Sequence, residues 1–84
     1  MVKHYNMDKK MIFYYDKDDD LLDISVGKPK KSVSTEIADD FFIRKNLKTG
    51  KITGFTILNF EKWFKGKNEE KEVPLTANFS FISK

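Results

Sequence analysis

Hydrophobic and polar residues alternate along several short stretches of this chain, in the pattern of β-strands. Residues 11–15 form an aromatic and aliphatic run with high strand propensity. The acidic stretch 16–20 follows and cannot continue a strand. Leu22, Ile24 and Val26 then alternate with polar residues, as in a strand with one side in water. Two such runs joined by a short polar stretch predict a β-hairpin.

More strands are expected further along the chain. Residues 27–31 contain a proline and form a loop, because proline has no amide to donate to a central strand. Residues 32–35 are expected to form a short edge strand. Residues 41–45 and 52–58 predict a second hairpin, with Gly50 supplying the positive φ that such a turn needs.

The pattern changes from period two to helical spacing after residue 58. Phe60, Trp63 and Phe64 lie at positions i, i+3 and i+4, which predicts a short helix with Asn59 as its N-cap. Gly66 is placed to end that helix.

Period-two alternation returns at the end of the chain. Leu75, Ala77, Phe79 and Phe81 are separated by polar residues, which predicts a last strand over residues 75–82 at an edge of the sheet. The expected fold is therefore α+β: one small domain over residues 1–84, with a mostly antiparallel sheet of four to five strands and one short helix.

Composition allows a core but limits its size. The chain has 84 residues, of which 39% are hydrophobic and 14% aromatic. There is no apolar run near the roughly 20 residues that a membrane helix needs. The chain contains no cysteine, which excludes a disulfide scaffold and a cysteine nucleophile. The first residues lack the apolar region of a signal peptide, so we expect a cytoplasmic protein.

The charge is uneven, with a net charge of +3 and a basic middle section. The basic candidates for nucleic-acid binding are Lys28, Lys30, Lys31, Arg44 and Lys45, together with Lys48 and Lys51. Proteins that bind single-stranded nucleic acid combine basic groups, which contact the phosphates, with an exposed aromatic ring on which a base stacks. Here the ring would be one of Phe41 and Phe42. The alternative is that both rings are core and that the lysines only keep the protein in solution.

The hairpins resemble a small prokaryotic family, the domain of unknown function number twenty-two eighty-three. Its members begin with Tyr-Asp, have a second Asp three residues on, and then Leu-Tyr-Ile, which corresponds here to residues 15–24. Their second hairpin has two glycines at the spacing of Gly50 and Gly54, where Gly54 marks a bulge or a close approach. The resemblance covers roughly residues 11–60 and implies an antitoxin-like or accessory role beside toxin-like partners.

The chain departs from the family pattern in three places. Asp23 stands where members usually have Tyr, and Thr56 stands where they usually have Glu. Arg44 and Lys45 replace a strand end that is often acidic. A chemical role that depended on the family Glu would be missing from this chain.

Catalytic and metal motifs are weak. Asp16, Asp18 and Asp20 have the spacing of a calcium loop, but Leu21 and Gly27 stand where its glycine and glutamate belong. His4 is the only histidine, and no nucleophile–base pair is indicated. We expect no enzyme, no metal and no cofactor.

Aromatic residues are the better candidates for function. Trp63, Phe64, Phe79 and Phe81 are expected to form a partner-binding cluster, because an edge strand is an open template for another chain. The partner would be a toxin-like or nuclease target, or a second copy in a homodimer. We therefore expect a small non-enzymatic protein-binding module, antitoxin-like or a mobile-element or phage inhibitor of the anti-CRISPR type. The alternative is a basic nucleic-acid-binding domain.

Overall fold

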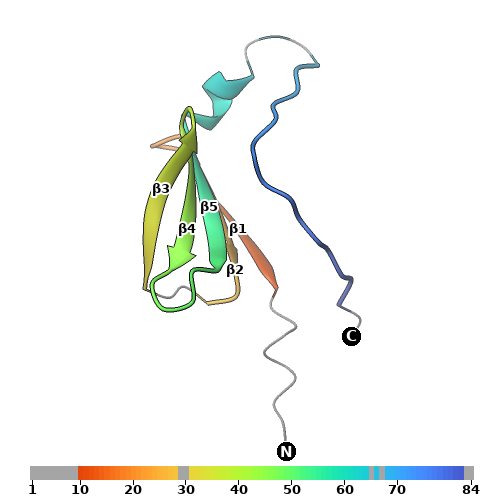
Figure 1. The fold of residues 1–84 in the computed structure, drawn as a ribbon. Coiled ribbons are helices and arrows are strands. Elements are labelled where there is room, and N and C mark those ends of the chain that lie inside the picture. Colours follow the sequence, from red (N-terminus) through yellow and green to blue (C-terminus); the bar gives the residue numbers. More distant parts are fainter. Residues whose placement is uncertain (1–9, 29–30, 65, 67, 83–84) are drawn as a thin grey trace, which may run out of the picture.

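Five antiparallel strands make up one sheet (Figure 1). The computed structural model describes residues 10–28, 31–64, 66 and 68–82. The strands are β1 (Met11–Asp16), β2 (Leu21–Val26), β3 (Ser32–Ala38), β4 (Phe41–Asn46) and β5 (Ile52–Leu58), in the spatial order β1-β2-β5-β4-β3. Both predicted hairpins, β1–β2 and β4–β5, are confirmed, and β3 is an edge strand as expected.

The last strand of the sheet lies at its centre. β5 pairs with β4 through a turn in which Gly50 has a φ of 75°, and with β2 across the middle of the sheet. The connection from β2 to β3 therefore has to pass β5 and β4 to reach the far edge. Strands β2 to β5 thus have Greek-key order.

Alternate residues of a strand point to the same side of a sheet, and here the apolar ones share one face. The buried core on this face consists of Ile24, Phe41, Ile43 and Ile57 among the described residues. Phe55 stacks on Phe41, with ring centroids 5.2 Å apart. No large side chain in the described part of the chain is fully buried, so this core is shallow.

The short helix expected after residue 58 is present only as one helical turn and is not an α-helix. Residues 60–64 form only a single 3₁₀ turn, η2 (Phe60–Trp63), and the backbone is already extended at Phe64. The fold is a small β-sheet with one helical turn, and the α+β assignment is not confirmed. Asn59 adopts a left-handed conformation with a φ of 52° and makes no capping hydrogen bond through its side chain. The carboxylate of Asp20 caps the turn instead, accepting the Glu61 N–H at 3.0 and 3.1 Å.

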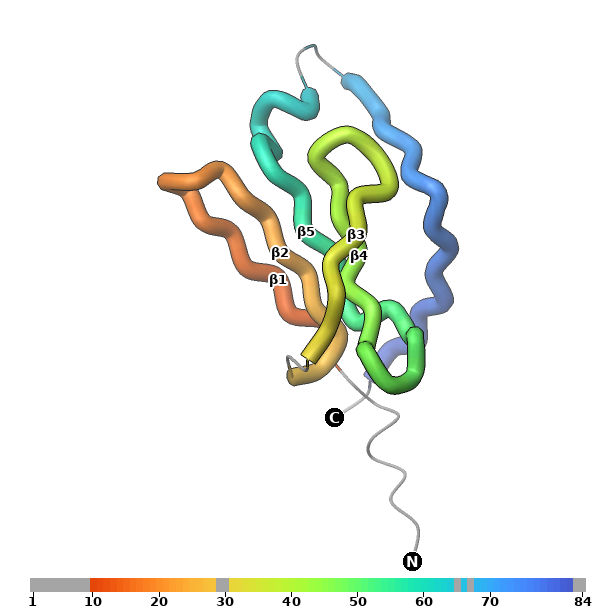
Figure 2. Tube along the Cα trace, turned by 60° about the vertical axis from the view of Figure 1, so that its left-hand side comes forward, coloured from red at the N-terminus to blue at the C-terminus, as the bar shows by residue number. Residues whose placement is uncertain are grey.

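The expected C-terminal strand is wrong. Residues 73–82, here called the C-terminal segment, run back along the sheet without pairing with a strand (Figures 1 and 2). Val73 and Leu75 pack against the core cluster. Residues 73–82 thus lie beside the apolar face, with which they enclose a groove, and not at an edge of the sheet. Only Leu75 of its period-two apolar residues packs against the core, and Ala77, Phe79 and Phe81 are exposed.

Candidate functional site

The apolar face is incompletely covered at the β1 edge. Met11, Phe13 and Tyr15 of β1 lie on the same face as the core, opposite Val26, Ile24 and Leu22 of β2. Phe13 is 64% exposed, whereas its cross-strand neighbour Ile24 is buried. Tyr15 packs edge-on against Phe60 of η2, and Met11 lies beside the C-terminal segment, but both side chains stay about two-fifths exposed.

A groove runs between the C-terminal segment and the sheet. It has a volume of about 960 Å³ and is lined on the sheet by Met11, Val26 and Phe55. Phe79 and Phe81 line it from the segment, yet 74% and 93% of these side chains are exposed. An apolar groove with exposed rings on its rim is the kind of surface that binds another protein.

The four predicted partner-binding residues have different roles. Trp63 stacks on Phe41, with centroids 5.7 Å apart, and its Nε1 donates to the Asp39 carbonyl at 3.0 Å. It therefore anchors η2 to the core. Phe64 packs edge-on against Trp63 and is about two-fifths exposed. Phe79 and Phe81 are free of such packing, and only these two have the exposure expected of partner contacts.

Sequence reasoning missed the β1 residues as site candidates. Residues 11–15 are apolar or aromatic at every position, on both faces of an edge strand. A strand with one wet face alternates, so an unbroken apolar run signals a second surface that needs covering. The sequence shows this apolar run, but it does not show that the strand lies at an edge of the sheet.

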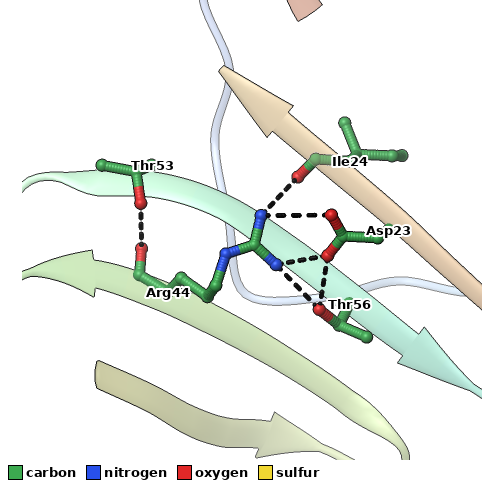
Figure 3. Close-up of polar contacts among 5 residues, drawn as sticks. All are labelled: Asp23, Ile24, Arg44, Thr53 and Thr56. Carbon is green, nitrogen blue, oxygen red and sulfur yellow. Dashed lines mark hydrogen bonds and ion pairs between the residues drawn. The ribbon is translucent and has the colours of Figure 1, made fainter. Parts of the chain in front are cut away.

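The opposite face carries a polar cluster around Arg44 (Figure 3). The guanidinium forms an ion pair with Asp23 and donates to Thr56 Oγ1 at 2.9 Å. It also donates to the Ile24 carbonyl at 3.4 Å, and Thr56 Oγ1 donates to Asp23 Oδ1 at 2.7 Å. The side chains of Arg44 and Asp23 are 21% and 27% exposed. Arg44 therefore ties β4 to β2 and is not available as a phosphate contact.

Gly54 makes the Arg44 cluster possible. It lies on β5 opposite Arg44 and Ser25, between the two strands that the ion pair joins. A Cβ at this position would lie against the guanidinium and 2.6 Å from the Ile24 carbonyl oxygen. The close approach expected at Gly54 is confirmed, and the group that approaches is the Arg44 side chain.

The remaining basic residues gather at one end of the sheet. Each strand reverses direction, so the loop 27–31 and the turn 47–51 lie at the same end. Lys28 and Lys51 line one hollow there, and the Leu47 N–H donates to the Lys31 carbonyl at 3.4 Å. In the described part of the chain this end holds Lys10, Lys28, Lys31, Lys45, Lys48 and Lys51 and no carboxylate. Lys30 lies outside the described residues.

Carboxylates gather at the other end, in the turn 17–20, the turn 39–40 and η2. Asp20 is the centre of this group. It accepts the Tyr15 hydroxyl at 2.9 Å and thereby raises the pKa of that phenol to about 12. Within residues 10–28, 31–64, 66 and 68–82, no three carboxylates or histidines are arranged to hold a metal ion.

Neither Phe41 nor Phe42 supplies an exposed ring at the basic end. Phe41 is buried in the core, and Phe42, opposite Glu36 and Thr56, is only partly exposed. Both begin β4, near the acidic turn 39–40. The expected combination of basic groups with an exposed Phe41 or Phe42 is therefore wrong.

Comparison with known proteins assigns the family. The sequence profile of a family described as "Protein of unknown function (DUF2283)" matches residues 12–60, more than half of the chain. The chain belongs to the DUF2283 family. No curated protein and no solved structure matches it. None of the helices described for the chain is both long and apolar enough to cross a membrane.

The DUF2283 match and the structure divide the chain in the same way. The matched residues contain nearly the whole sheet, from the second residue of β1 to the start of η2. The C-terminal segment with Phe79 and Phe81 lies outside the match. The groove is therefore built between the family sheet and a segment that the family profile does not include.

Three of the residues at which the chain departs from the pattern expected of the family meet in one place. Asp23 and Thr56 are cross-strand neighbours, and Arg44 bonds to both. An acidic residue at position 44 would stand beside Asp23 and repel it. Asp23, Thr56 and Arg44 therefore form one interacting set.

Proposed function

We propose that this DUF2283 protein is a cytoplasmic, non-enzymatic protein-binding module whose partner occupies the apolar groove. The observation that carries the proposal is the exposure of Phe79 and Phe81 beside an apolar sheet face with a shallow core. Exposed aromatic anchors around an apolar surface are typical of protein interfaces. The finer class, an antitoxin or a phage or mobile-element inhibitor, rests on the family resemblance alone.

The C-terminal segment suits this role because it is held at one end. Val73 and Leu75 fix it to the core cluster, and residues 76–82 continue over the sheet without strand pairing. A partner that enters the groove would bury Phe79 and Phe81 together with Met11 and Val26 of the sheet. The segment then acts as one wall of the binding site.

The test is affinity capture with matched variants. Tagged wild-type protein and a Phe79→Ser/Phe81→Ser variant are incubated with extract of the native host, and the bound proteins are identified by mass spectrometry after nuclease treatment. Lys48→Ser, at the basic end, is the control. A protein retained by wild type and the control but lost from the double variant supports the proposal. A partner that binds all three equally, or no partner, contradicts it.

Nucleic-acid binding is the second candidate, favoured by the all-lysine end of the sheet. Its support comes from these lysines, because Arg44 is ion-paired and Phe41 is buried. Contacts of this kind weaken steeply with salt. We expect only weak binding of single-stranded DNA at physiological salt, measured by fluorescence anisotropy and lost in Lys28→Glu/Lys51→Glu. A sub-micromolar complex at that salt would place this function first.

A further inference from the structure

The two edges of the sheet are protected to different degrees. β3 carries a bulge between Glu36 and Ala38, and polar residues predominate along it. β1 pairs with β2 in unbroken register from Met11 to Asp16, and its first five residues are uncharged and exposed. Natural edge strands are usually blocked by charges, bulges or proline. β1 has none of these between Met11 and Tyr15.

The backbone groups on the outer side of β1 can be assigned. The Gly27 N–H donates to the Lys10 carbonyl at 2.9 Å, so Lys10 and Gly27 form a hydrogen-bonded pair. Such pairs alternate with non-hydrogen-bonded ones in an antiparallel ladder. Met11, Phe13 and Tyr15 therefore point their N–H and C=O groups away from β2. No strand of the described chain pairs with them.

We propose that β1 pairs antiparallel with β1 of a second copy, about a two-fold axis at Phe13, to form a continuous ten-stranded sheet. In this register Phe13 faces Phe13 of the second copy, and Met11 faces Tyr15. All outward N–H and C=O groups of the three residues are then paired. If the register were shifted by two residues in either direction, Met11 or Tyr15 would lie opposite a residue outside β1.

The distribution of charged residues along the sheet favours the same antiparallel arrangement. The two-fold axis reverses the second copy, so the lysine end of one sheet lies beside the carboxylate end of the other. Lys10 is then directly opposite Asp16 of the second copy, once on each side of the axis. Complementary charges favour this orientation, whereas parallel pairing would bring like charges together. Lys10 and Met11 also line the groove, but the inference uses the outward backbone groups of β1, so it does not depend on the proposed function.

The first test uses proline at an outward-facing amide. Phe13→Pro removes one donor from the outer edge and leaves the β1–β2 hydrogen bonds in place. Ser34→Pro is the matched control on β3, because the bond from Leu47 N–H to Lys31 O makes the Ser34 amide face outward too. Sedimentation velocity at tens of micromolar is expected to show a dimer for wild type and Ser34→Pro. Phe13→Pro should weaken dimerisation at least tenfold.

The second test uses the absence of cysteine from the natural chain. Phe13→Cys places two thiols across the proposed axis, at the Cα separation of about 5.5 Å that a disulfide accepts. Under mild oxidation, Phe13→Cys should form covalent dimers at least ten times faster than Ser34→Cys or Tyr14→Cys. This result does not depend on whether the proline variant folds. A monomeric wild type, a dimer insensitive to Phe13→Pro, or faster cross-linking at position 14 or 34 would overturn the inference.

Discussion

The Arg44–Asp23 pair offers the sharpest test of how this sheet is held together. The perturbation is a double-mutant cycle of Arg44→Met and Asp23→Asn. Methionine keeps most of the arginine stem without its charge, and asparagine keeps the shape of the aspartate and its bond with Thr56. The cycle isolates the interaction across β5, because neither variant introduces a new charge.

The magnitude follows from burial and contacts. Exposed ion pairs contribute about 0.2–1 kcal/mol, and removing one partner of a fully buried pair costs about 3–5 kcal/mol. With 21% and 27% of the two side chains exposed, this pair lies between these limits. We expect Arg44→Met to cost about 2 kcal/mol, Asp23→Asn about 1.5 kcal/mol, and the double variant about 2 kcal/mol, a coupling of about 1.5 kcal/mol. A domain of this size has only about 5 kcal/mol in total.

The assay is urea unfolding followed by circular dichroism and by the fluorescence of Trp63, the only tryptophan. Lys45→Met is the control: it removes an exposed cation from the next position of β4 and should change stability by less than about 0.5 kcal/mol. If the two single variants add to within about 0.3 kcal/mol in the double variant, the cluster does not couple β2 to β4 and this reasoning is refuted.

Three further predictions concern single residues. Gly54→Ala should cost about 2 kcal/mol in urea unfolding, because its Cβ would lie 2.6 Å from the Ile24 carbonyl oxygen and displace the guanidinium; an unchanged midpoint would contradict this. Tyr15 should ionise at about pH 12, because Asp20 accepts its hydroxyl, so the bond stabilises the fold below pH 10 and is lost as the pH rises through about 12. Ultraviolet titration of wild type against Tyr15→Phe measures this, and Asp20→Asn should lower the value towards 10. Trp63→Ala should cost about 3 kcal/mol and nearly unfold the protein, whereas Phe81→Ala should leave the melting temperature unchanged; equal effects would show that both rings are core.

Local patterns in the sequence determined the strands and turns. β2 alternates because its two sides differ in polarity, and the polar residues 17–20 form the turn that ends β1. Gly50 has the positive φ that its hairpin turn requires. These features depend on neighbours within a few residues, so they can be predicted without knowing the rest of the fold. The family resemblance over roughly residues 11–60 rests on the same local features and is confirmed by the match over 12–60.

Tertiary structure decided which strands meet and what covers the sheet. The pairing of β2 with β5 joins residues 29 to 37 positions apart, and together with the β4–β5 pairing it places Arg44 within reach of Asp23. The same pairing puts β5 in the centre, and residues 75–82 cross a face although their alternation matches that of a strand. It also leaves β1 at an open edge. Periodicity in the sequence shows which side of a segment is apolar. Only the order of the strands in the sheet decides whether that side is covered by another strand, by a passing segment or by a second molecule.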